Sequence, residues 1–208
     1  MDTVLSSEGT PTDIQVLKGK LRELVRYASS SRLKIHTDSS EIEVKDLDVN
    51  CKPGRILANN MVFILMSGDA LRVTFKVHFN IRNAKCLAFR IFGGASPEAI
   101  SGKQAIDYFK EYGNLVAGSV VTLVEKIDVE LGISLPLCTR GFYEVFSDYS
   151  EKQHPIITYC DFWKLEVGEH EIYCSALIEI LDKKQLGKLV DYEIAEEADG
   201  NDGEMDFL

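Results

Sequence analysis

The chain has 208 residues, 45% of them hydrophobic and 27% charged, and its formal net charge is −10. That length and composition predict one globular domain of ordinary size with extra segments, with two small domains as the alternative. An acidic chain without a basic cluster in its sequence excludes nucleic acid and anionic membranes as expected partners.

The negative charge is concentrated at the C-terminus. Residues 191–208 contain eight acidic side chains and no basic ones, and the run ends in the apolar tip 205–208. This composition is typical of a disordered, solubilising tail, and docking of the tip on a partner is the alternative. We therefore predict a flexible N-terminal tail over 1–12, an α+β domain over 13–182 and an acidic disordered tail over 183–208.

Signals for export, metal binding and common catalytic chemistry are missing from the sequence. No basic region followed by an apolar run is visible near the N-terminus, and the longest apolar run, 61–66, is too short to span a bilayer. The five cysteines form no C-x-x-C pair, and the four histidines have no metal-ligand spacing. We therefore expect a soluble, cytoplasmic protein with neither structural zinc nor a disulfide framework. Phosphate-binding loops and nucleophile motifs are also absent.

The first predicted elements are a helix and a short ribbon. Apolar residues spaced by three and four over 14–28 predict a core-facing helix, which Thr12 or Asp13 would cap and the serines 29–31 would end. Alternating apolar residues on either side of 38–40 then predict a β-ribbon that contains Leu33, Ile35, Ile42 and Val44.

Two β-hairpins are predicted from alternation and turn residues. The first joins strands 62–67 and 71–79 through Gly68 and Asp69. His78 falls among the polar positions of its strand, so we expect a surface histidine. The second hairpin joins strands 156–166 and 171–181 around a turn at 167–170.

Between the hairpins, the spacing returns to that of helices. Asn80 would cap a helix over 81–91 that Gly93 ends. A long helix over 102–131 follows, and then an extended segment in which Pro136 favours a sheet edge. Weaker patterns predict a short strand over 141–146, a loop over 149–154 and a brief helix over 183–192. Adjacent antiparallel hairpins with several helices indicate an α+β domain whose helices cover a sheet.

The long helix carries an unusual polar strip. At about 100° per residue, Asp107, Glu111, Asn114 and Gly118 fall within about 60° of one another, opposite the apolar stripe. Glycine inside a helix costs about 1 kcal/mol relative to alanine, and asparagine is also a poor helix former. A small residue beside a carboxylate and an amide suggests that another molecule comes close there. The alternative is an ordinary solvated helix face.

The pattern Asp-x3-Glu-x2-Asn-x21-Pro, formed by Asp107, Glu111, Asn114 and Pro136, resembles the signature of the CheC/CheX/FliY chemotaxis phosphatases. The motif occurs once, which makes the chain most like CheX. The resemblance covers roughly residues 13–182 and implies a two-layer α+β fold, with an antiparallel sheet covered by long helices.

The resemblance also implies a reaction. The substrate would be the aspartyl phosphate of a CheY-type response regulator, with Asn114 orienting the attacking water and Glu111 pairing with the regulator's active-site lysine. Asp107 and Pro136 would shape the site, while relief of crowding by Gly118 is our own inference. The chain would need no cofactor of its own, because Mg²⁺ would belong to the phosphorylated partner, and it would form a homodimer.

Two other readings of the same strip stay open. A non-catalytic adaptor could use this helix or the apolar tip 205–208 to bind a response regulator or a flagellar or chemotaxis partner. An unrelated structural domain would be favoured if Asn114 were buried.

Overall fold

The computed structural model describes residues 11–37, 41–47, 58–140 and 157–194. Its elements in chain order are α1 (Pro11–His36), β1 (Glu43–Asp46), β2 (Asn60–Ser67), β3 (Leu71–Phe79), α2 (Ile81–Phe92), the 3-10 helix η2 (Pro97–Ala99), α3 (Gly102–Glu125), β4 (Gly132–Ile133), β5 (Leu137–Arg140), β6 (Ile157–Val167), β7 (His170–Ile180) and the 3-10 helix η3 (Gly187–Leu189).

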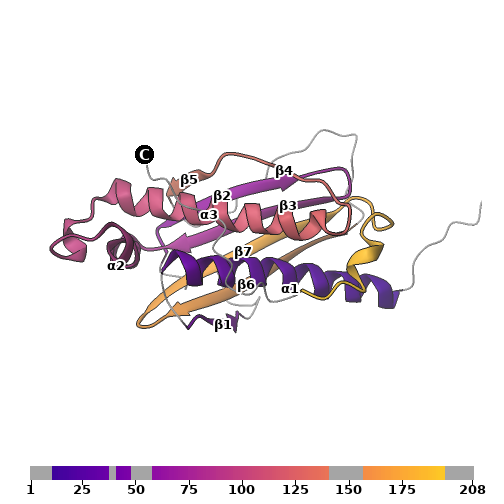
Figure 1. The fold of residues 1–208 in the computed structure, drawn as a ribbon, viewed down its shortest axis with the longest axis horizontal. Helices are drawn as coiled ribbons and strands as arrows, with labels where there is room; N and C mark the ends of the chain where they lie inside the picture. The colour runs from indigo at the N-terminus through magenta and orange to yellow at the C-terminus, as the bar shows by residue number, and fades with distance from the viewer. Residues whose placement is uncertain (1–10, 38–40, 48–57, 141–156, 195–208) are drawn as a thin grey trace, which may run out of the picture.

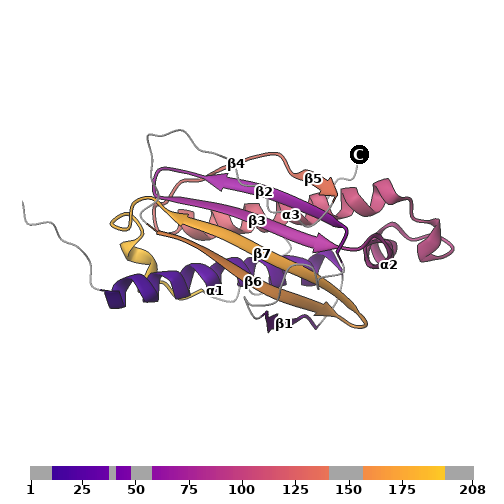
Figure 2. The same cartoon turned by 180° about the vertical axis from the view of Figure 1, so that it is seen from behind.

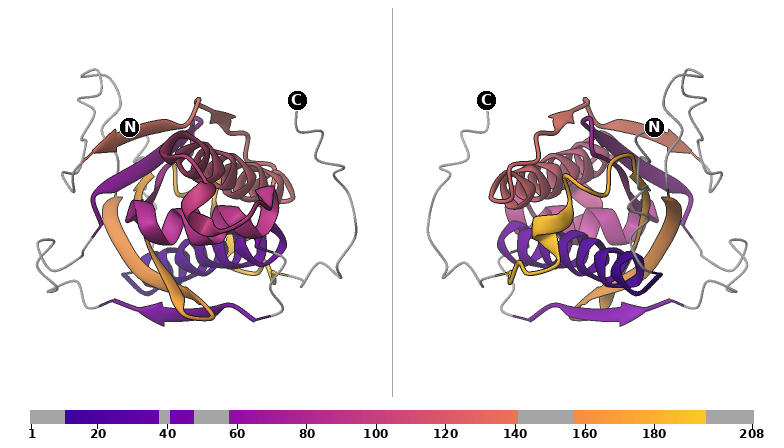
Figure 3. Two further views of the ribbon diagram at one scale, coloured as in Figure 1. Left: turned by 90° about the vertical axis from the view of Figure 1, so that its left-hand side faces the viewer. Right: turned by 90° about the vertical axis from the view of Figure 1, so that its right-hand side faces the viewer.

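The described strands form one antiparallel sheet in the order β1-β6-β7-β3-β2-β4, and β5 also pairs with β2. The long helices α1 and α3 lie side by side across one face of this sheet (Figure 1). Seen from behind, the strands lie in front of both helices (Figure 2). End-on views show the sheet curving around the helical layer (Figure 3). The predicted α+β class, with an antiparallel sheet covered by long helices, is confirmed.

Both predicted hairpins are present. In the first, β2 and β3 pair in register from Asn60↔Phe79 to Ser67↔Arg72. In the second, β6 and β7 pair up to Val167↔His170, and Gly168 in the two-residue turn has φ 58°, a conformation that glycine adopts without strain. The cap of α2 is also as predicted, because the Asn80 side chain accepts a hydrogen bond of 2.8 Å from the Asn83 backbone.

The prediction for the ends of the first helix is wrong. Helix α1 begins at Pro11, before the proposed caps, and runs through the serines to His36. Ser29 is tolerated because its hydroxyl donates to the Arg26 carbonyl at 2.8 Å and accepts from Trp163 Nε1 at 3.1 Å. Leu33 then continues the buried stripe and is fully buried.

The prediction of a β-ribbon is wrong because α1 is longer than expected. Leu33 and Ile35 are helical, so they cannot pair with the segment that follows. That segment forms β1, which pairs instead with β6 at the far edge of the sheet, with Val44 opposite Leu165.

The prediction of a surface His78 is also wrong. The side chain is 3% exposed, and one ring nitrogen lies 3.1 Å from Ser175 Oγ on the neighbouring strand. Strand β3 lies in the interior of the sheet, and every one of its residues is buried, including those that alternate away from the helices. Burial, together with the charge of Lys76, lowers the pKa of His78 to about 4.

Helix α3 ends earlier than predicted, at Glu125 instead of residue 131. Asp128 has φ 63°, which breaks the helix, and the Val129 amide returns to the Val124 carbonyl at 3.1 Å. Val129 is buried. The apolar residues after the helix therefore enter the core as a turn, although their spacing continued the helical pattern.

The packed part of the chain extends to Ile194, past the predicted boundary at residue 182. Leu186 and Leu189 are buried, and the Tyr192 carbonyl accepts from Lys20 Nζ at 3.0 Å. Only the short η3 forms in the segment predicted as a brief helix. The predictions for 1–10, 38–40, 141–146, 149–154 and 195–208 lie outside the described residues. None of the described helices is long and apolar enough to cross a membrane.

Candidate functional site

Helix α3 is anchored at its start and along its buried side. Ser101 and Gln104 form a reciprocal capping box, with backbone-to-side-chain distances of 3.1 and 2.9 Å. One turn further on, the Phe109 ring stacks on Phe79 of β3 with centroids 4.1 Å apart. The Tyr112 hydroxyl donates to the Ser29 carbonyl of α1 at 2.9 Å. These contacts fix the rotation of α3 and so determine which residues face outward.

The outward strip has the geometry that the helical spacing predicts. Asp107 is exposed, and Glu111, Asn114 and Gly118 are partly exposed. Asn114 Nδ2 donates to Glu111 Oε2 at 3.4 Å. A carboxylate and an amide are thus held side by side at the surface. The reading that required a buried Asn114 loses its support.

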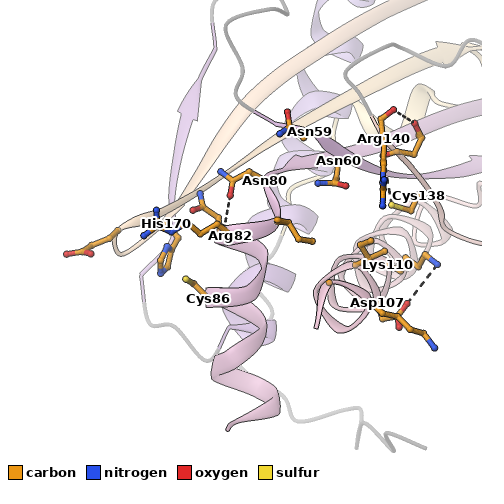
Figure 4. A pocket seen from close by; sticks show the side chains of 17 residues that line it. Asn59, Asn60, Asn80, Arg82, Cys86, Asp107, Lys110, Cys138, Arg140 and His170 are labelled. Atoms are coloured by element: carbon orange, nitrogen blue, oxygen red, sulfur yellow. Dashed lines mark hydrogen bonds and ion pairs between the residues drawn. The ribbon is translucent and has the colours of Figure 1, made fainter. Parts of the chain in front are cut away.

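Asp107 lies one turn before this pair and has a different neighbour. Its Oδ1 is 3.9 Å from Lys110 Nζ, and the two side chains are 48% and 38% exposed. Figure 4 shows both residues on α3 at the rim of a groove whose opposite walls are α2 and β5. Asp107 therefore belongs to the groove as well as to the strip.

Among the described residues, nothing next to Gly118 requires a glycine. A Cβ placed there would meet no atom of another described element within 4 Å, so the helix tolerates a larger residue at this position. Gly113, which we did not single out from the sequence, differs: a Cβ there would lie 3.6 Å from Val62 Cγ1 in the core. The space beside Gly118 is open on the face that carries Glu111 and Asn114.

Pro136 lies between β4 and β5, both of which pair with β2 and contact α3. It is therefore at a sheet edge, as predicted, beside the helix and not on it. Three apolar side chains flank it and are exposed, namely Ile133 at 46%, Leu135 at 83% and Leu137 at 56%. We did not identify this apolar edge from the sequence, although its alternation around Pro136 is visible there.

His36 lies behind the strip, at the end of α1. One ring nitrogen is 3.1 Å from the Tyr108 carbonyl, and the ring packs on Tyr108 with centroids 4.2 Å apart. Burial lowers the pKa of His36, and the Tyr108 carbonyl and the charge of Glu111 oppose that shift. We did not single out His36 from the sequence, because α1 was predicted to end before it.

The chemistry available on the strip is limited to orientation and charge. Glu111 can accept hydrogen bonds from a cationic group, and the Asn114 amide can both donate and accept. Within the described parts of the chain, no group of three or more His, Cys, Asp or Glu side chains could hold a metal ion. The strip can therefore offer hydrogen bonds to a water molecule and a negative charge to a cation.

The sequence matches no family model and no curated protein, but solved structures share its fold. The chemotaxis protein CheX from Vibrio vulnificus is 12% identical, with a TM-score of 0.57 over 76% of this chain and 96% of that one. A chain of the CheX-CheY-BeF3-Mg²⁺ complex from Borrelia burgdorferi is 16% identical, with the same TM-score and coverage. FliY from Thermotoga maritima is 14% identical, with a TM-score of 0.55 over 89% of this chain and all of that one.

At these identities the likeness establishes the fold. The chain has the CheC/CheX/FliY fold, so the resemblance inferred from the spaced motif on α3 is confirmed at that level.

Proposed function

We propose that this chain is a phosphatase that hydrolyses the aspartyl phosphate of a CheY-type response regulator in chemotaxis or two-component signalling. The observation that carries the proposal is the contact between Glu111 and Asn114 on the exposed face of α3, at the spacing of the signature and on the CheX fold. The partner class is supported by the solved complex of a structural relative, which contains CheX, CheY, BeF3 and Mg²⁺.

The residue types suit phosphoryl transfer to water. The transition state requires mainly a water molecule in line with the leaving oxygen and stabilisation of the charge on the phosphoryl group. In the proposed step, the water oxygen bonds to phosphorus as the bond to the aspartyl oxygen breaks, which yields inorganic phosphate and a free carboxylate. Asn114 would hold the water through its amide without taking its proton. The rigid packing of α3 would keep that amide in place.

Glu111 would set the approach of the partner. Its carboxylate would pair with the regulator's active-site lysine, and the hydrogen bond from Asn114 would limit the positions that the carboxylate can take. Asp107 and Pro136 would shape the flanks of the site, and the open space at Gly118 would admit the regulator's backbone. The magnesium ion would be bound by the regulator and stabilise the charge of the phosphoryl group.

Catalysis distinguishes this proposal from the adaptor function. The regulator is phosphorylated in the presence of Mg²⁺. The chain is then added at one-twentieth of the regulator's molar concentration, and released phosphate is measured over time. A phosphatase releases many phosphates per chain. An adaptor binds the regulator and leaves its phosphoryl lifetime unchanged, which would contradict the proposal.

The adaptor remains the second candidate because of the apolar edge around Pro136. Exposed apolar side chains such as Leu135 and Leu137 are typical of a surface that binds another protein, and such binding needs no chemistry. A homodimer, which the resemblance implies, is also part of the proposal. Light scattering would test it, because a dimer has twice the chain mass of 23.3 kDa.

A further inference from the structure

A groove of about 1320 Å³ opens at the N-terminal end of α3, between that helix, α2, β5 and the turn that joins β6 to β7. Four cationic side chains line it, and only two anionic ones, Asp107 and Glu169, oppose them (Figure 4). The groove is therefore a positive region on a chain whose net charge is −10. The cations are Arg82, Lys103, Lys110 and Arg140.

His170, which also lines the groove, does not change this balance at neutral pH. Its pKa is lowered by burial and by the nearby charge of Arg90, against a smaller opposing effect of Glu169.

The groove is also partly apolar. Ile81, Ile106 and Cys138 line it and pack against the hydrophobic core with part of their surface exposed. A ligand that matches this lining has carboxylates to meet the rim and apolar side chains to meet the floor. A small inorganic anion would leave the apolar part uncovered.

The same chain contains a segment with this composition. Residues 202–208 read Asp-Gly-Glu-Met-Asp-Phe-Leu, with three carboxylates interleaved with apolar side chains. We propose that this C-terminal segment binds in the groove of its own chain. Carboxylates of Glu204 and Asp206 would pair with the cationic rim, while Phe207 and Leu208 would cover the apolar floor.

The chain is long enough to reach the groove. The last described residues lie against α1, because the Tyr192 carbonyl accepts from Lys20 Nζ at 3.0 Å. Along α1, Lys20 lies about 24 Å from His36 at 1.5 Å per residue. The His36 ring packs on Tyr108, which follows the groove residue Asp107. An extended segment covers about 33 Å between Ile194 and Glu204. Glu204 and Asp206 therefore reach the groove, whereas Glu196 and Glu197, which are nearer to Ile194, do not.

Binding there would affect the face next to the groove. Asp107 lines the groove and lies one helical turn from Glu111. The bound segment would flank the surface that the proposed function assigns to the regulator. The inference that the segment binds does not depend on that function, because it rests on the groove, the charges and the reach of the chain.

Carbodiimide cross-linking of the full chain tests the inference, because this reagent joins a carboxylate directly to an amine in contact with it. Cross-linked peptides are identified by mass spectrometry. The expected links join Glu204 or Asp206 to Lys103 or Lys110. Links from these acids only to Lys20 and Lys188, which lie near the start of the segment, would overturn the inference.

Charge reversal provides the second readout. Each exposed ion pair changes a binding equilibrium by up to about fivefold, so Arg82→Glu combined with Arg140→Glu should lower the yield of the groove links by about tenfold. The matched control combines Lys34→Glu with Lys184→Glu, two exposed positions outside the groove with the same change in charge. An equal effect of both variants would contradict specific binding. If the first variant failed to fold, the link map of the wild-type chain would still decide.

Isotope mixing identifies which chain supplies the segment. Equal amounts of ¹⁴N- and ¹⁵N-labelled chains are combined before cross-linking. Links within chains of one label support the proposal. If half of the links joined light to heavy chains, as random exchange between copies requires, the segment would come from a second copy and the proposal would be wrong.

Discussion

The amide of Asn114 lies 3.4 Å from the carboxylate of Glu111, three residues earlier on the same exposed helix face. Residues three apart are neighbours on a helix surface, so the contact follows from the fold of α3 alone. What the tertiary structure adds is the orientation of that face. The buried Phe109 and Tyr112 turn the pair outward and hold it there.

Removal of the Glu111 charge should weaken the association with the regulator. We expect Glu111→Gln to raise the regulator concentration needed for half-maximal phosphate release by about tenfold. Glutamine keeps the shape of the side chain but removes the charge that would pair with the regulator's lysine. The maximal rate should fall less. Glu125→Gln, an exposed change at the end of the same helix, is the control. An unchanged half-maximal concentration in Glu111→Gln would rule out pairing of Glu111 with the partner.

Gly118→Ala should separate stability from function. Because a Cβ there meets no atom within 4 Å, the variant should raise the free energy of unfolding by about 0.5–1 kcal/mol through helix propensity. The added methyl group should obstruct the docked regulator and reduce phosphate release. Urea unfolding and the phosphate assay measure the two effects. A more stable variant with undiminished release would show that glycine is not required for docking.

Ser29 joins α1 to both the sheet and α3. Ser29→Ala should lower the free energy of unfolding by about 1–3 kcal/mol, because the buried Trp163 Nε1 loses its acceptor. Ser30→Ala is the matched control, because the Ser30 hydroxyl donates to the Tyr27 carbonyl one turn back on the same helix. Equal effects of the two substitutions in chemical denaturation would contradict a specific role for Ser29.

His78 should make the fold sensitive to mild acid. Its folded pKa of about 4 lies below the ordinary value of 6.5, so the unfolded chain binds the proton more readily. Burial of neutral His78 therefore contributes fully to the free energy of unfolding above pH 6.5, and this contribution is lost as the pH falls from 6.5 to 4. The free energy of unfolding should therefore fall by about 2 kcal/mol between pH 7.5 and pH 5 because of this histidine.

Chemical denaturation of the wild type and of His78→Gln at both pH values isolates the histidine. Glutamine cannot take up the proton, so the His78→Gln variant should lose about 2 kcal/mol less stability than the wild type between the two pH values. Identical losses in the two proteins would show that His78 is not held neutral by the fold.

The parts of the fold that were predicted correctly are those with clean local patterns. The alternation in β2 and β3, the turn at Gly168 and the Asn80 cap each depend on residues close together in sequence. The same is true of the strip on α3, because helical spacing alone places Glu111 beside Asn114. The pairing of Glu111 with Asn114 was therefore visible in the sequence.

The features that were missed depend on partners far apart in sequence. The serine run continues α1 because Trp163, on β6, supplies a hydrogen bond to Ser29. His78 is buried because its strand is in the interior of the sheet, a position that alternation does not reveal. The basic groove gathers Arg82, Lys103 and Arg140 from separate elements, so no cluster of positive charge appears in the linear sequence.

The central claim is that Asn114 positions the attacking water, and phosphate release by Asn114→Ala tests it most directly. The variant is compared with the wild type and with Thr122→Ala, an exposed change on the same helix, at saturating phosphorylated regulator and Mg²⁺. We predict a loss of at least about tenfold, or 1.4 kcal/mol of transition-state stabilisation, with regulator binding retained. Release at the wild-type rate by a folded Asn114→Ala protein would contradict the mechanism.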